Sequence, residues 1–280
     1  MFERQRAAMV PDAKLQLSNK YLLEFDQLAR LLNAACGDGR ERIPRADLVT
    51  AIGLSDRHVK QLCGIAQAFG LLKNITLRPT QLGRLVHQYD PFFDDLGTLW
   101  FLHYIISSDQ RHIIWSRLVT EIVPVYRAFT REQARATFDD LQGTFSEDSI
   151  KKHVLSELNT VLDAYTNQNL SRLVYLKMNG EGYTLGYREP VPALVVAASI
   201  VHYRDEYQAG ASAVAIQNLL TDPCGPTVVF QLSEERLRTM LEELKTQPGL
   251  SLESRADLDQ VRLADSMSAD DWMRRYYEQR

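Results

Sequence analysis

Residues 55–70, SDRHVKQLCGIAQAFG, contain the signals that best predict the structure of the N-terminal third. Ser55 is a favoured residue at a helix N-cap and Gly70 at a helix C-terminus, so the stretch predicts one helix. Apolar residues recur along it at helical spacing, which predicts one buried face. That face holds Val59, Leu62, Cys63, Ala66 and Phe69. The opposite face is cationic and rich in amides, and it holds Arg57, His58, Lys60, Gln61, Gly64 and Gln67.

The segments around this helix complete a recognisable order. Residues 19–35 carry leucines and a phenylalanine at helical spacing, and Pro44 fits the first turn of a short helix that ends at Gly53. After Gly70, the segment LLKNITLRPTQLG predicts one short strand or a wing. Helix, short helix, turn, helix and strand is the order of a winged helix-turn-helix. We therefore predict such a module over residues 1–90.

This module predicts a DNA-binding surface. Lysine, arginine and glutamine are side chains that contact phosphates and base edges in a duplex. The outer face of the third helix and the wing after it supply the candidate nucleic-acid-binding residues. They are Arg57, His58, Lys60, Gln61, Lys73, Asn74 and Arg78. The alternative is that the module contacts protein and that its charges are only solvated.

Charge is unevenly distributed along the chain, whose net charge is −4. Residues 1–90 contain 13 Lys/Arg and 9 Asp/Glu, residues 91–190 contain 10 and 13, and residues 191–280 contain 9 and 14. The excess of positive charge is confined to the N-terminal third, which is where a polyanion would bind.

Residues 91–190 are predicted to form a helical middle domain with a possible β-hairpin wing. The patterns indicate a helix interrupted at Pro124 and a long helix that begins near Ser146 with a capping signal. The sequence LVYLKMNGEGYTLGYREP then predicts two short strands around NGEG.

Residues 191–280 are predicted to form a second winged-helix-like module and a tail. PCGPTVVFQL predicts a turn and a strand, Ser233 predicts a helix N-cap, and LSLESRADLDQVRLAD predicts one or two strands. The candidate recognition surface carries glutamates that would repel DNA phosphate. They are Glu234, Glu235, Glu242 and Glu243. We therefore expect this module to bind a protein partner or a second copy, and we expect a last helix to dock through Trp272 and Tyr276.

The stretch from Tyr89 to Trp115 raises the question of catalysis because it combines aspartates with histidines. Asp90, Asp94 and Asp95 could hold a metal ion only if His103 or His112 converged with them. His103 lies two turns or more beyond Asp95 on one predicted helix, a rise of about 12 Å, which is too far for a shared ion. The favoured interpretation is that Asp90 belongs to a turn, that Asp94 or Asp95 caps a helix, and that His103 is buried with one hydrogen-bond partner.

Other chemistry is not indicated by the sequence. It contains neither a phosphate-binding glycine loop nor a nucleophile elbow, and its three cysteines form no CxxC pair. The histidines lack ligand spacing, so no metal site and no cofactor are predicted. There is no signal-peptide core or long apolar run, so we expect a cytoplasmic protein that does not contact a membrane.

Most of the chain resembles an uncharacterised bacterial family, a "domain of unknown function" family. The resemblance rests on QAFGLL, LRPTQLGRLVHQYDPFFDDLGTLWFLHYIIS, IKKHVLSELNTVLDAY and TVVFQLSEERL, in this order. Members occur in phage-defence loci and in DNA-modification loci of the phosphorothioation type, beside proteins that look like phosphoadenosine-phosphosulfate reductases. The family pattern assigns no catalytic residue, so the resemblance implies a DNA-linked process and no particular reaction.

Together these patterns predict a mainly α protein with small β wings, in which winged helix-turn-helix modules lie at both ends of a helical middle region. The expected function is that of a non-catalytic DNA-binding accessory or regulatory protein of a bacterial modification or defence system. Its expected partners are double-stranded DNA and proteins of the same complex, and a second copy of the chain is a further candidate. The alternative is a protein-interaction scaffold that makes no DNA contact, and the least favoured hypothesis is a metal-dependent hydrolase or nuclease.

Overall fold

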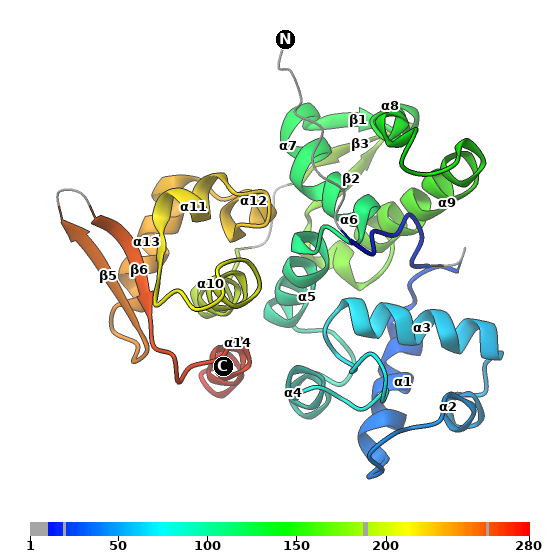
Figure 1. Ribbon diagram of the computed structural model, residues 1–280, viewed down its shortest axis with the longest axis horizontal. Helices are drawn as coiled ribbons and strands as arrows, with labels where there is room; N and C mark the ends of the chain where they lie inside the picture. Colours follow the sequence, from blue (N-terminus) through cyan, green and yellow to red (C-terminus); the bar gives the residue numbers. More distant parts are fainter. Residues whose placement is uncertain (1–10, 19–20, 187–189, 256–257) are drawn as a thin grey trace.

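The computed structural model describes residues 11–18, 21–186, 190–255 and 258–280 (Figure 1). The N-terminal third is helical, as predicted. Its helices are α1 (Phe25–Gly37), α2 (Arg45–Ile52), α3 (Asp56–Ala68) and α4 (Gln81–Tyr89).

Local signals set the ends of α2 and α3 where the sequence predicts them. Gly53 ends α2 in the left-handed region, with φ 68°, a conformation that glycine adopts without strain. The Ser55 side chain then accepts a hydrogen bond from the backbone N–H of His58 and caps α3. The two helices are therefore joined by a short, defined turn.

Of the short strand or wing predicted between α3 and α4, the strand does not form. In the described residues this segment contains one isolated antiparallel bridge, between Leu72 and Pro79. The Lys73 N–H donates to the Arg78 carbonyl oxygen at 2.8 Å, which closes a tight turn. Thr80 caps α4 immediately after Pro79, so too few residues remain on either side of the turn for a ladder.

The middle third confirms the predicted hairpin. Strands β2 (Leu176–Asn179) and β3 (Gly182–Leu185) pair antiparallel, and β1 (Ala128–Thr130) adds to the other edge of β3. The other elements are α5 (Leu96–Ser108), α6 (Ile113–Arg117), the π-helical turn η1 (Leu118–Ile122), α7 (Val123–Tyr126), α8 (Arg131–Ala136), η2 (Asp139–Leu141), α9 (Glu147–Thr166) and η3 (Asn169–Leu173). The interruption predicted at Pro124 takes the form of η1, a wider turn that precedes the proline.

The C-terminal third contains a second three-stranded antiparallel sheet, in the order β4-β6-β5. Its elements are α10 (Ala193–Tyr207), β4 (Ala213–Ala215), α11 (Ile216–Thr221), α12 (Pro226–Phe230), α13 (Glu234–Leu244), β5 (Leu250–Arg255), β6 (Leu258–Leu263) and α14 (Ala269–Glu278). The strand predicted within PTVVF is wrong because these residues form α12. Gly225 is the N-cap of α12 and Pro226 occupies its first turn, a position in which proline favours a helix.

Helix α5 lies at the centre of the molecule and is buried along almost its whole length. It contacts α6, α10 and α12, while the last helix, α14, contacts both α10 and α4 (Figure 1). The C-terminal end of the chain therefore packs against its N-terminal third, and the buried apolar side chains form one continuous core. No helix within the described residues is long and apolar enough to span a membrane.

Candidate nucleic-acid interface

Three of the predicted DNA-binding cations are exposed and available. Arg57 and Lys60 project from α3 one turn apart, and Lys73 lies in the turn after α3. Within the part of the chain that the structure describes, no hydrogen bond or ion pair engages these three side chains. Free cationic side chains on one helix and the turn beside it are the arrangement that phosphate contacts require.

The first turn of α3 is held in place by an ion pair to α2. The Arg45 guanidinium donates to the Asp56 carboxylate at 2.8 Å, and this hydrogen bond lowers the pKa of Asp56. The pair holds together the two helices on either side of the Gly53 turn. It also neutralises the one acid at this end of the cationic face.

The turn after α3 is held by contacts of its backbone. Gln67 Nε2 donates to the Asn74 carbonyl oxygen at 2.9 Å, and the Ile43 N–H donates to the Thr76 carbonyl oxygen at 2.9 Å. The Asn74 side chain is exposed, as predicted. The turn is thus fixed against α3, which places Lys73 beside the C-terminal end of that helix.

Arg78 differs from the three exposed cations in its surroundings. Its guanidinium pairs with Glu41, and its side chain is partly buried. The ion pair joins the turn after α3 to the segment before α2, so Arg78 also contributes to the structure of the turn. The sequence could not reveal this pairing because Glu41 lies 37 positions away.

Two further predicted contact residues are covered in this structure. Gln61 is 1% exposed, so its placement on the outer face of α3 is wrong. His58 is half-buried, and its ring stacks on that of Tyr21 with centroids 4.2 Å apart. Gln61 is therefore closed off in this conformation, and the His58 ring is covered on the face that stacks on Tyr21.

Residues 11–18, which we call the N-terminal strap, lie against the side of α3 that holds Gly64. The strap passes between α3 and the pair α6 and α9, as the dark blue segment of Figure 1 shows. The Lys14 N–H donates to the Arg111 carbonyl oxygen at 2.8 Å, and Leu15 is buried. The strap could not be recognised in the sequence because residues 11–18 have no helical or strand periodicity.

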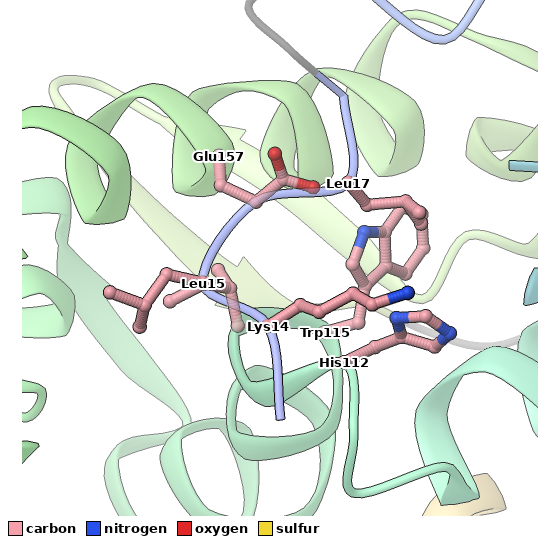
Figure 2. Close-up of a pocket in the computed structure, with 7 residues that line it drawn as sticks. Lys14, Leu15, Leu17, His112, Trp115 and Glu157 are labelled. Atoms are coloured by element: carbon pink, nitrogen blue, oxygen red, sulfur yellow. The ribbon is translucent and has the colours of Figure 1, made fainter. Parts of the chain in front are cut away.

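Glu157 of α9 anchors the strap. Its carboxylate accepts hydrogen bonds from the Ser18 N–H at 3.0 Å and from the Ser18 hydroxyl at 2.6 Å. Burial raises the pKa of Glu157, against the hydrogen bonds from Ser18, Leu17 and Trp115 that lower it. In Figure 2, Leu15 and Leu17 of the strap lie beside Glu157 of α9 and Trp115 of α6. This hollow has no space for a water molecule, so it is not a ligand pocket.

The aspartates between α4 and α5 act as caps. Asp90 accepts hydrogen bonds from the backbone N–H groups of Asp94 and Asp95, at 2.8 and 3.1 Å, and burial raises its pKa. Asp95 caps α5 through the Thr98 N–H at 2.8 Å. Its second oxygen accepts from the Tyr276 hydroxyl at 3.1 Å and pairs with Arg280 at 2.9 Å. The predicted turn and cap roles are confirmed, and Asp95 additionally holds the C-terminal helix.

His103 is completely buried in α5 and makes two hydrogen bonds, one more than predicted. Its Nδ1 lies 2.5 Å from the Tyr165 hydroxyl and its Nε2 lies 3.2 Å from the Val229 carbonyl oxygen. A carbonyl can only accept, so Nε2 carries the proton and Nδ1 accepts from Tyr165. Burial lowers the pKa of His103 to about 4, which keeps the imidazole neutral.

These groups do not fit a divalent metal ion. The oxygens of Asp90 and Asp95 are engaged by backbone and side-chain donors, and Asp94 is paired with Arg172. Among the described residues no group of three or more His, Cys, Asp or Glu side chains could hold an ion.

The fold and the exposed cations define a mainly helical protein with two small antiparallel sheets and one cationic helix surface. A family model described as "Protein of unknown function (DUF4007)" matches residues 50–277, and the chain belongs to this family. Curated proteins gave no match.

Two solved structures share the fold. "Magnesium ion-bound SspB crystal structure" has a TM-score of 0.73 at 15% sequence identity, with 92% of this chain and 92% of that chain covered. "SspB crystal structure" has a TM-score of 0.72 at 15% identity, with 94% and 93% covered. At 15% sequence identity these comparisons show a shared fold and nothing further.

Proposed function

We propose that this chain is a double-stranded-DNA-binding accessory or regulatory protein of a bacterial DNA-modification or phage-defence system. The observation that carries the proposal is the set of exposed, unpaired cations Arg57, Lys60 and Lys73 on α3 and its adjoining turn. The proposed role is to bind DNA without transforming it. The setting in a modification or defence system comes from the family resemblance.

We interpret α2, the Gly53 turn and α3 as a helix-turn-helix whose wing is reduced to the turn at residues 73–78. The C-terminal elements from α10 to β6 fit a winged-helix module, because a helix and a first strand are followed by helices and a hairpin. The strand order β4-β6-β5 places the first strand beside the last, which supports this interpretation. In this arrangement α3 is the DNA-facing helix of the N-terminal module.

The corresponding C-terminal helix, α13, is proposed to face a protein partner or a second copy of the chain. Its exposed surface is acidic and would repel phosphate. Of its two arginines, Arg238 is paired with Glu234 at 2.8 Å and with Asp259 at 2.6 Å. Because the exposed surface of α3 is cationic and that of α13 is acidic, we propose that α3 contacts DNA and α13 contacts protein.

A gel-shift assay on random duplex DNA at two salt concentrations tests the proposal. Three phosphate contacts predict that log Kd rises with log salt with a slope of about 3. Replacement of Arg57 and Lys60 by alanine should weaken binding on every sequence and reduce the slope by about 2. The matched control is Arg236→Ala with Lys245→Ala, which removes two exposed cations from the acidic end.

An absent or salt-insensitive shift would exclude DNA binding and leave the scaffold function as the better interpretation. A pull-down with proteins encoded beside this gene, in the presence of nuclease, separates the two functions. Partner capture that survives nuclease treatment while DNA is not bound would support the scaffold. Conversion of supercoiled plasmid to a nicked form in the presence of magnesium would contradict the proposed non-catalytic role.

A further inference from the structure

We infer that the N-terminal strap is an autoinhibitory cover over one side of α3, and that its release exposes His58 and Gln61 for DNA contact. The inference rests on the proposed function and assigns a regulation to the same surface. It divides the predicted DNA-binding residues into two groups. Arg57, Lys60 and Lys73 are always available, whereas His58 and Gln61 are available only in an open state.

The strap contacts the side of α3 that the exposed cations leave free. Leu17 Cδ1 would lie 3.7 Å from a Cβ atom placed at Gly64, so the strap packs directly on the helix. Tyr21, beyond the strap, stacks on the His58 ring with an interplanar angle of 12°. On an α-helix, His58, Gln61 and Gly64 lie three residues apart on one side, so Gln61 lies between the residue that Leu17 contacts and the residue on which Tyr21 stacks.

The covered groups are polar and poorly satisfied. Both amide atoms of Gln61 and the His58 Nε2 atom are buried and have no hydrogen-bond partner among the described residues. A buried polar group without a partner destabilises the state that buries it. The closed state therefore covers groups that would gain partners from water or from DNA once the strap moves.

The closed state is held by the buried Leu15, by the Lys14 N–H bond to Arg111 and by polar contacts of Ser18. The Ser18 hydroxyl and N–H both donate to Glu157, and the Thr160 hydroxyl donates to Ser18 Oγ at 3.2 Å. Apart from Leu15, the strap's side chains are only partly buried or exposed, save for Ser18 itself. A short segment held in this way can detach without loss of the core, which is the property of an element that opens locally.

A disulfide lock tests the inference in a single protein that carries Leu17→Cys and Gly64→Cys. Oxidation with diamide should fix the strap closed, and reduction with dithiothreitol should free it. We expect the oxidised form to bind duplex DNA about tenfold more weakly than the reduced form, the usual size of a lost base-edge contact. Equal affinities of the two forms, once mass spectrometry shows the 17–64 disulfide, would overturn the inference.

A second variant needs no disulfide. Leu17→Asp with Ser18→Ala places a carboxylate beside Glu157 and removes the Ser18 hydroxyl, so the strap should detach. Hydrogen exchange at Lys14, whose N–H is bonded to Arg111 in the closed state, reports its release. In this background Gln61→Ala should weaken DNA binding about tenfold, whereas in the oxidised, disulfide-locked background it should have no effect.

The two proposals fail in different ways. If Gln61→Ala has the same effect in both backgrounds, the strap does not control this surface, although DNA binding stands. If no form shifts DNA at low salt, the proposed function fails and the inference fails with it.

Discussion

At the scale of the residue, Asp94 and Asp95 show how adjacent, identical side chains acquire different roles. Asp94 is exposed and pairs with Arg172 at the surface. Asp95 is 5% exposed, caps α5 and bonds to two residues of the C-terminus. The two aspartates differ in their roles because Asp95 is the N-cap of α5 and because α14 packs beside it.

Replacing Asp95 by alanine should lower the free energy of unfolding by about 2 kcal/mol, because a cap is lost and the Tyr276 hydroxyl loses its acceptor. Asp94→Ala is the matched control and should change stability by less than about 0.5 kcal/mol, as expected for an exposed ion pair. Urea denaturation followed by circular dichroism measures both values. Equal losses for the two variants would show that the buried contacts of Asp95 do not stabilise the fold.

His103 predicts a pH dependence of stability. Its pKa is about 4 in the folded protein, below the ordinary value of 6.5, so the unfolded chain binds the proton more readily. The stabilisation is therefore complete above about pH 6.5 and is lost as the pH falls towards 4. Between about pH 7.5 and pH 5 the contribution amounts to about 2 kcal/mol.

The variant His103→Phe isolates this effect from the other titrating groups. Urea denaturation of both proteins at the two pH values should show that the stability difference between them narrows at the lower pH. A difference that stays constant would mean that His103 does not remain neutral on folding.

At the scale of the element, α14 is the clearest case of a predicted helix whose role depends on its partners. Its cap at Ser268 and its apolar Trp272 could be recognised in the sequence. Its docking site could not, because the site is formed by α10 and by residues of α4 and α5. Tyr277 stacks on Tyr89 at 5.0 Å, and its hydroxyl lies 2.7 Å from the Thr98 hydroxyl.

Gly97→Ala should displace α14. A Cβ atom at Gly97 would lie 2.3 Å from the Tyr276 ring, so Tyr276 must move and its hydrogen bond to Asp95 is lost. We expect a loss of about 1–3 kcal/mol, the usual cost of overpacking. Faster amide exchange in α14 should accompany the loss.

Gly37→Ala provides the control, since nothing lies within 4 Å of a Cβ atom at Gly37. Alanine reduces the freedom of the unfolded chain, so this variant should be neutral or slightly stabilised. Equal denaturation midpoints for the two variants would show that Tyr276 accommodates the methyl group without undocking α14.

At the scale of the whole molecule, the three predicted segments share one core. Helix α5 of the middle third contacts α10 and α12, and α14 returns to α4. Because the first and last thirds are joined through these contacts, we expect urea unfolding to be a single cooperative transition. Circular dichroism and tryptophan fluorescence should give coincident curves, since the tryptophans lie in α5, α6 and α14. Separate transitions for the two probes would indicate that the segments unfold independently.

Sequence patterns were sufficient for the features that depend on neighbours within one or two helical turns. The helix caps at Ser55, Ser146 and Ser233, the hairpin around Gly180 and the cap role of an acid before α5 are confirmed. These features depend on local backbone hydrogen bonds, so a short window of residues contains their cause. The errors at Pro226 and at the segment before Thr80 are also local, since a strong helix start outweighed β-branched composition.

The candidate interface required the tertiary structure. Periodicity placed Gln61 with Lys60 on an outer face, but a helix has several sides and the sequence does not show which of them a distant segment covers. Gln61 is buried and His58 stacks on Tyr21, whereas Arg57 and Lys60 are exposed and Glu41 pairs with Arg78. These outcomes depend on contacts between residues tens of positions apart, whose free energy appears only when the chain folds and brings them together.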